Sequence, residues 1–150
     1  MNTVTNQTQS QSETEIRNMI ADWQKAVTAC DVPKVMTYYA PNVLAFDAVG
    51  KLQFKGAKAY GAHWQACIDH CKGPMTFEVH ELGVTAAKQV AFGHYVVRCG
   101  GEGPDGAQHT SWLRATACFQ KLDGQWKIVH EHFSAPFEMP SGKALFDLQP

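Results

Sequence analysis

The chain has 150 residues, of which 45% are hydrophobic and 18% charged, and its formal net charge is −1. This length and composition are typical of one globular domain with a substantial core. The near-neutral charge, without a basic block, argues against nucleic acid as a partner, and no apolar run approaches the length of a membrane span. The first residues lack a signal-peptide pattern, and the five scattered cysteines are expected to be reduced thiols in a cytoplasmic protein.

The first half of the chain predicts helices. Residues 1–12 are polar and low in complexity, so we expect a disordered tail. A helix is predicted over residues 13–30, because apolar side chains recur there every three or four positions. These are Ile16, Met19, Ile20, Trp23, Ala26, Val27 and Cys30. Shorter helices are expected over 33–39, which begins with a proline, and over 57–71, which a Gly-Pro pair ends.

The second half predicts strands, because the apolar period changes to two after residue 75. Strands are expected over 76–85 and 89–99, followed by a long hairpin. Helices followed by an antiparallel meander indicate an α+β domain. We expect the helices to lie on one face of a curved sheet that encloses a pocket against them. The domain is predicted over residues 13–137, and 138–150 form a C-terminal tail.

The hairpin centres on Asp123-Gly124, a pair that tolerates the positive φ angles of a type I′ turn. A two-residue turn places Leu122 opposite Gln125, and the same register places Thr116 opposite Glu131. One face then carries Arg114, Thr116, Cys118, Val129, Glu131 and Phe133. We interpret this face as the floor of a polar pocket. The alternative is a solvated face with an Arg114–Glu131 ion pair, and a slip of one residue would exchange the two faces.

Three stretches resemble the SnoaL-like, ketosteroid-isomerase-like branch of the nuclear transport factor two-like superfamily. Residues 38–50 (YYAPNVLAFDAVG) resemble its passage from the second helix to the first strand. Residues 54–58 (FKGAK) resemble the entry to its third helix, and residues 112–116 with 121–136 resemble its last two strands. The resemblance implies the branch's fold, a cone-shaped, curved antiparallel sheet wrapped around three N-terminal helices and enclosing a pocket. That fold hosts isomerases, cyclases, dehydratases and non-catalytic binding or assembly modules.

The resemblance also implies roles for individual residues. The general-base aspartate of the steroid isomerases falls on Asp47, and their two oxyanion donors fall on Trp23 and Cys118. An indole N–H can donate a hydrogen bond, whereas a thiol donates only weakly, so the donor set for steroid isomerisation is incomplete. The apolar neighbours of Asp47 suit a general base, and its alternative role is that of a turn aspartate.

Several other residues have two readings each. Glu131 is a pocket acid or base, or it only holds Arg114, and the ion pair is favoured. Arg114 is a clamp for a substrate carboxylate, or it is internally paired. His94 is a proton partner or, as we favour, a structural histidine. The remaining candidates for the pocket wall, or for the core, are Trp23, Tyr38, Phe46, Tyr60, Trp64 and Phe133.

Histidines and cysteines cluster in two places. His63, Cys67, His70 and Cys71 lie within two turns of the third helix, with side chains that suit zinc or copper. One helix rarely supplies a whole site and both cysteines fit the buried stripe, so no metal or cofactor is expected. His130 and His132 share the opposite sheet face, which the resemblance implies is the interface of a homodimer.

These observations predict a small-molecule enzyme or a binding module. The enzyme would be a cofactor-independent isomerase, cyclase or dehydratase acting on a small apolar or carboxylate-bearing carbonyl compound. Asp47 would be its base, Arg114 the anchor, and Glu131 or His94 the proton partner. The alternative is a non-catalytic ligand-binding or dimeric assembly module.

Overall fold

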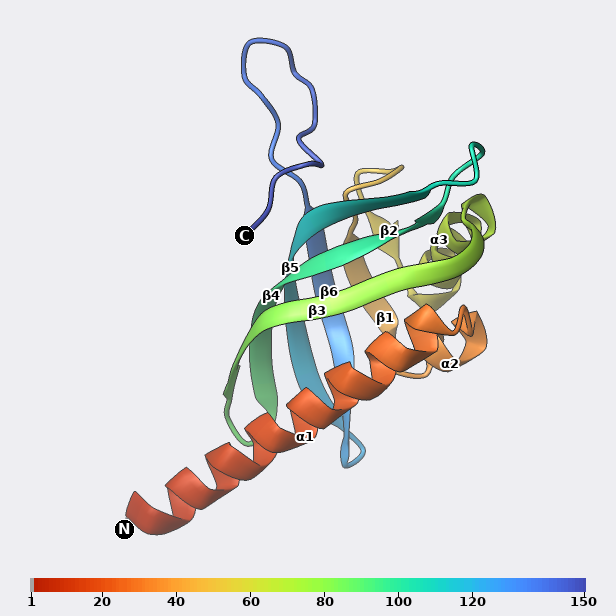
Figure 1. Cartoon of the computed structure of the whole chain (residues 1–150). Helices are drawn as coiled ribbons and strands as arrows, with labels where there is room; N and C mark the ends of the chain where they lie inside the picture. Colours follow the sequence, from red (N-terminus) through yellow and green to blue (C-terminus); the bar gives the residue numbers. More distant parts are fainter. Residues whose placement is uncertain (1) are drawn as a thin grey trace.

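The computed structural model describes residues 2–150, with the side chains of residue 9 and residues 11–150. It confirms the α+β fold: a curved six-stranded sheet holds three helices on one side (Figure 1). The elements are α1 (Asn2–Thr28), α2 (Val32–Met36), β1 (Tyr39–Phe46), β2 (Phe54–Lys55), α3 (Ala57–His70), β3 (Lys72–Ala86), β4 (Val90–Glu102), β5 (Gln108–Leu122) and β6 (Gln125–Ser134). The strand order is β2-β1-β6-β5-β4-β3.

Helix α1 buries its apolar stripe as predicted, with Ile16, Ile20, Trp23 and Val27 all in the core. However, α1 begins at Asn2, so the segment expected to be a disordered tail is helical. Once the apolar stripe holds a helix in place, each further residue needs only propagation and no new nucleus. Residues 2–12 contain neither glycine nor proline that would stop it. Figure 1 shows these first turns of α1 extending past the strands.

The short helices are placed by local chemistry. Asp31 caps α2 through a hydrogen bond from the Lys34 backbone N–H to its carboxylate, at 3.0 Å, and Pro33 occupies the first turn. Helix α3 buries Tyr60, Trp64 and Ile68. Their spacing of four residues faces one side of the helix, so α3 presents an aromatic stripe toward the sheet.

The hairpin turn forms as predicted. Asp123 and Gly124 have φ angles of 49° and 79°, and Leu122 lies opposite Gln125. The predicted register holds as far as the Phe119–Ile128 pair and then shifts, because Cys118 lies opposite His130. A β-bulge therefore leaves Val129 without an opposite residue.

The bulge exchanges the two faces of β6 after Val129, so the prediction of which β6 residues share a face with which β5 residues is wrong there. Glu131 and Phe133 lie on the inner face, opposite Ala117 and Ala115. The outer face carries Arg114, Thr116, Cys118, His130 and His132. The predicted pocket floor is thus divided between the two sides of the sheet.

The sheet also departs from a purely antiparallel arrangement, since β1 pairs with β6 in parallel and places Ala45 beside Glu131. After β6 the chain forms a loop in which Phe137 bridges to Ala144. This loop projects beyond the sheet in Figure 1 before the C-terminus returns. The Trp112 backbone N–H donates to the Phe146 carbonyl at 3.4 Å, which joins the returning segment to β5.

Candidate functional site

A cavity of about 170 Å³ lies between α3 and the inner face of the sheet. It is lined by Asp47, Val49, His63, Trp64, Cys67, Cys71, Met75, Phe77, Cys99, Gly100, Leu113 and Phe133. Trp64 packs against Phe77 and Phe133 with ring centroids 6.1 and 6.5 Å apart. Among the described residues, the lining contains one carboxylate and one imidazole but no lysine or arginine. The cavity is therefore suited to a small, largely apolar molecule.

Asp47 lies directly after β1 and uses its two carboxylate oxygens differently. Oδ1 accepts a hydrogen bond from the Val49 backbone N–H at 3.0 Å, which fixes the carboxylate in a turn. Oδ2 lies 3.4 Å from His63 Nε2 and 3.4 Å from the Tyr60 hydroxyl. The side chains of Asp47 and His63 are only 14% and 11% exposed. The turn therefore holds one oxygen and leaves the other beside an imidazole at the cavity wall.

His63 comes from α3, one turn after Tyr60, and its ring stacks on Phe54 with centroids 4.1 Å apart. Cys67 Sγ lies 3.6 Å from His63 Nε2, the same nitrogen that faces Asp47. A nucleophilic Cys–His–Asp arrangement needs the two partners on different ring nitrogens, so the geometry does not form one. Burial, followed by the Asp47 charge, raises the pKa of Cys67 to about 11, which keeps it a neutral thiol.

Glu131 lies behind this pair and is completely buried. Its Oε2 is 2.8 Å from both the Tyr39 and the Tyr60 hydroxyls. Oε1 has no hydrogen-bond partner among the described residues. Burial raises the pKa of Glu131 to about 7, although the hydrogen bonds from Tyr39 and Tyr60 oppose this shift.

Small neighbours make room for this carboxyl group. Ala117 lies opposite Glu131 on β5 and Ala45 beside it on β1, and both are buried. Burial raises the pKa values of Tyr39, Tyr60 and Tyr95 well above 10, and the charge of Glu131 adds to the effect. The tyrosine hydroxyls around Glu131 consequently stay protonated and can donate hydrogen bonds.

The structure brings only some of the predicted residues to the cavity. Asp47, Trp64 and Phe133 line it. Trp23 lies deeper and is only 1% exposed. Its ring packs edge-on against the Trp64 ring, with centroids 6.0 Å apart. Trp64 Nε1 is buried without a hydrogen-bond partner among the described residues.

The other candidates lie outside the cavity, and the predicted Arg114–Glu131 pair is wrong. Arg114 is exposed on the outer face, where its Nε donates to Ser134 Oγ at 3.2 Å. Thr116 and Cys118 share that face because alternate residues of β5 point to the same side of the sheet. They cannot serve as a pocket floor, and Arg114 cannot anchor a ligand inside the cavity.

Three further predicted residues have different surroundings. His94 is exposed on β4, and its ring lies against Gly83 of β3. A Cβ atom added at Gly83 would lie 2.5 Å from the His94 ring, so the ring occupies the space that a side chain at this position would need. Phe46 packs its ring against His130 and His132, with centroids 4.8 and 5.5 Å apart. Tyr38 lines a separate groove. None of the three reaches the Asp47–His63 pair.

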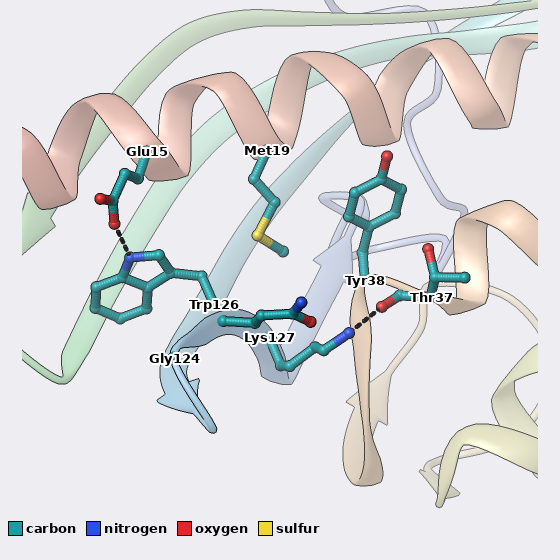
Figure 2. A pocket seen from close by; sticks show the side chains of 8 residues that line it. Glu15, Met19, Thr37, Tyr38, Gly124, Trp126 and Lys127 are labelled. Atoms are coloured by element: carbon teal, nitrogen blue, oxygen red, sulfur yellow. Dashed lines mark hydrogen bonds between the residues drawn. The ribbon is translucent and has the colours of Figure 1, made fainter.

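That groove has a volume of about 400 Å³ and lies between α1 and the turn joining β5 to β6 (Figure 2). Trp126 Nε1 donates to Glu15 Oε2 at 2.8 Å, and this hydrogen bond is the main cause that lowers the pKa of Glu15. Lys127 donates to the Thr37 carbonyl (Figure 2). The charged groups in this groove are therefore engaged by the protein itself.

Among the residues the structure describes, no three histidine, cysteine or acidic side chains are grouped closely enough to hold a metal ion. The His63–Cys71 segment instead contributes His63 to the cavity beside Asp47. Sequence reasoning considered His63 only as a metal ligand. Its position one helical turn after Tyr60 is the signal that could have placed both side chains on the same face.

The chain matches the SnoaL-like domain over residues 16–138. It belongs to the SnoaL-like family. A nuclear transport factor two-like protein of unknown function from Pseudomonas putida KT2440 is similar at 45% identity, with a TM-score of 0.87 over 94% of this chain and 98% of that one.

More distant structures share the fold. One, from Novosphingobium aromaticivorans and provisionally named a scytalone dehydratase, has 13% identity and a TM-score of 0.76, covering 85% of this chain and 86% of that one. A nuclear transport factor two-like superfamily protein from Salmonella enterica has 15% identity and a TM-score of 0.76, covering 91% of this chain and 99% of that one. No curated protein matches the chain significantly. Of the helices described, none is both long and apolar enough to cross a membrane.

Proposed function

We propose that this SnoaL-like protein is a cofactor-independent lyase that removes water from a small, neutral, apolar β-hydroxy carbonyl compound. The observation that carries the proposal is the Asp47–His63 pair, with Oδ2 3.4 Å from Nε2 at the wall of an apolar cavity. Dehydration needs a base for a carbon-bound proton and an acid for the leaving hydroxyl. A carboxylate and an imidazole side by side supply both.

The pair can complete the reaction without another proton source. Asp47 takes the proton from the carbon next to the carbonyl, while protonated His63 gives a proton to the hydroxyl leaving the following carbon. The C–H and C–O bonds break, a C=C bond forms, and water leaves. Asp47 then returns its proton to His63 across their 3.4 Å contact. The pair is restored for the next turnover.

Charge that develops on the substrate carbonyl oxygen needs a hydrogen-bond donor. Trp64 contributes to the cavity wall, and its indole N–H is buried and has no acceptor among the described residues. We propose that the Trp64 ring turns when substrate binds, so that this N–H donates to the carbonyl oxygen. This donor takes the place of the incomplete pair that Trp23 and Cys118 would provide.

The charges of the lining select the substrate class. No lysine or arginine of the part of the chain that the structure describes lines the cavity, and Asp47 faces it with a carboxylate. A substrate carboxylate would be buried without a cationic partner, which is costly. We therefore keep the apolar carbonyl compound of the sequence-based hypothesis and drop the carboxylate-bearing one. The dehydratase name given provisionally to one structural neighbour supports the reaction class.

The experiment follows the conversion of 3-hydroxycyclohexanone to cyclohexenone by ultraviolet absorbance. Wild type is expected to accelerate it, and Asp47→Asn to lower kcat/KM by at least ~100-fold, since general-base catalysis contributes about that much or more. Asp69→Asn is the matched control, because Asp69 is exposed on α3 and bonds only Gln65 in the described structure. Equal loss in both variants, or none in Asp47→Asn, would contradict the proposal.

Binding of the ketone without turnover would favour the alternative function, a non-catalytic ligand-binding module.

We retain two further expectations as proposals. The protein forms a homodimer through the outer sheet face with His130 and His132, next to the Phe46 ring. It works in the cytoplasm, which the free state of all five cysteines supports.

A further inference from the structure

The Tyr60 hydroxyl lies between two carboxyl groups. It is 2.8 Å from Glu131 Oε2 and 3.4 Å from Asp47 Oδ2. A phenol carries a single proton, so Tyr60 can donate to only one of them at a time. Which carboxyl group receives that hydrogen bond depends on which of them already carries a proton of its own.

Glu131 has the surroundings of a group that gains and loses a proton. The titratable groups that act on it are Tyr39 from β1, Asp47 after β1, Tyr60 from α3 and Tyr95 from β4. The uncharged Trp23 of α1 acts on Tyr39, and the His63 ring of α3 lies 3.4 Å from Asp47 Oδ2. Since Oε1 has no described partner, an ionised Glu131 would hold negative charge on an unsatisfied buried oxygen.

The two protonation states arrange the hydrogen bonds differently. An ionised Glu131 accepts from both tyrosines at Oε2, where the distances are 2.8 Å each. A neutral Glu131 with its proton on Oε2 can instead donate to the Tyr60 oxygen. The Tyr60 proton is then free to point to Asp47 Oδ2.

We propose that Glu131 is a positioning residue for Asp47: its proton decides whether the Tyr60 hydroxyl donates to Glu131 or to Asp47. This inference rests on the proposed function, in which Asp47 is the base. When Glu131 ionises, Asp47 loses a hydrogen-bond donor and gains a negative neighbour, so the surroundings of the proposed base change. Because the pKa of Glu131 is raised to about 7, the rearrangement falls near neutral pH.

The test observes both carboxyl groups without any substrate, so its result is independent of catalysis. Protein with 13C-labelled aspartate and glutamate carboxyls is titrated by NMR from pH 5 to 9. In wild type, the Asp47 Cγ resonance should show an inflection at the same pH as Glu131 Cδ. Glu131→Gln should abolish this inflection, and Tyr60→Phe should reduce its amplitude at least twofold.

Tyr39→Phe is the matched control, because it removes the other tyrosine 2.8 Å from the same Glu131 oxygen but leaves the path to Asp47. The Asp47 inflection should persist in it. Should Glu131→Gln not fold, the comparison of Tyr60→Phe with Tyr39→Phe decides the matter. An Asp47 resonance without the shared inflection in wild type, or equal effects of the two phenylalanine variants, would overturn the proposal.

Discussion

Ala117 and Glu131 face each other across β5 and β6. An uninterrupted continuation of the Asp123-Gly124 register would place His130 opposite Ala117 instead. The bulge at Val129 shifts the strand by one residue, and a shift of one residue exchanges its two faces. It brings a carboxyl group into the core and directs His130 toward the outer face. The proposed site depends on that exchange.

The buried carboxyl group predicts a pH-dependent stability. Burial raises the pKa of Glu131 from 4.5 to about 7, so the folded state disfavours its ionisation. The neutral Glu131 side chain contributes fully to the free energy of unfolding at a pH below its pKa in the unfolded chain. This contribution is lost as the pH rises to its pKa in the folded protein, hence between about pH 4.5 and 7. Wild type should lose about 3 kcal/mol of unfolding free energy across this range relative to Glu131→Gln. Urea denaturation at several pH values measures it, and parallel curves would refute it.

The cavity thiols should be unreactive. Burial raises the pKa of both Cys67 and Cys99 to about 11, so at pH 8 roughly one in a thousand of each is thiolate. Cys30 is exposed. Iodoacetamide at pH 8, followed by peptide mass spectrometry, should label Cys30 first. Labelling of Cys67 or Cys99 at the rate of Cys30 would show that the cavity is open to solvent in a way the structure lacks.

The outer sheet face predicts the oligomeric state. Thr116 is exposed on β5 between His94 and His132. Thr116→Glu would place a charge in the proposed interface and should weaken a dimer at least tenfold, since burying an unpaired charge is costly. Sedimentation velocity should find wild type at twice the 16.6 kDa chain mass. Ala66→Glu, on the exposed side of α3, is the control that should leave the dimer intact. A monomeric wild type would end this proposal.

Local signals predicted much of the fold. The α1 stripe and the Asp123-Gly124 turn depend on residues close together in sequence, and both formed as expected. The bulge could not be predicted in this way. It follows from packing that joins Glu131 to Tyr39 on β1 and Tyr60 on α3, 92 and 71 residues away in sequence.

The candidate site was predicted only in part, because it too depends on contacts between residues far apart in sequence. Asp47 was identified through a family resemblance and does lie at the cavity. His63 was missed as its partner, because their contact joins a turn after β1 to the middle of α3. The alternation of a strand indicates two faces without saying which one is inside, so it could not place Arg114 on the correct face.

The most direct test of the proposed site uses the four tryptophan indole N–H signals, since each reports a different place. Trp64 lines the cavity, Trp126 the groove of Figure 2, Trp112 a hollow near the C-terminus on the outer face, and Trp23 the core. Titration of 15N-labelled protein with 1-indanone, a neutral ketone, should move the Trp64 signal and leave Trp112 and Trp126 in place. Movement of Trp126 or Trp112 with Trp64 unchanged would put the ligand elsewhere and contradict the proposed site.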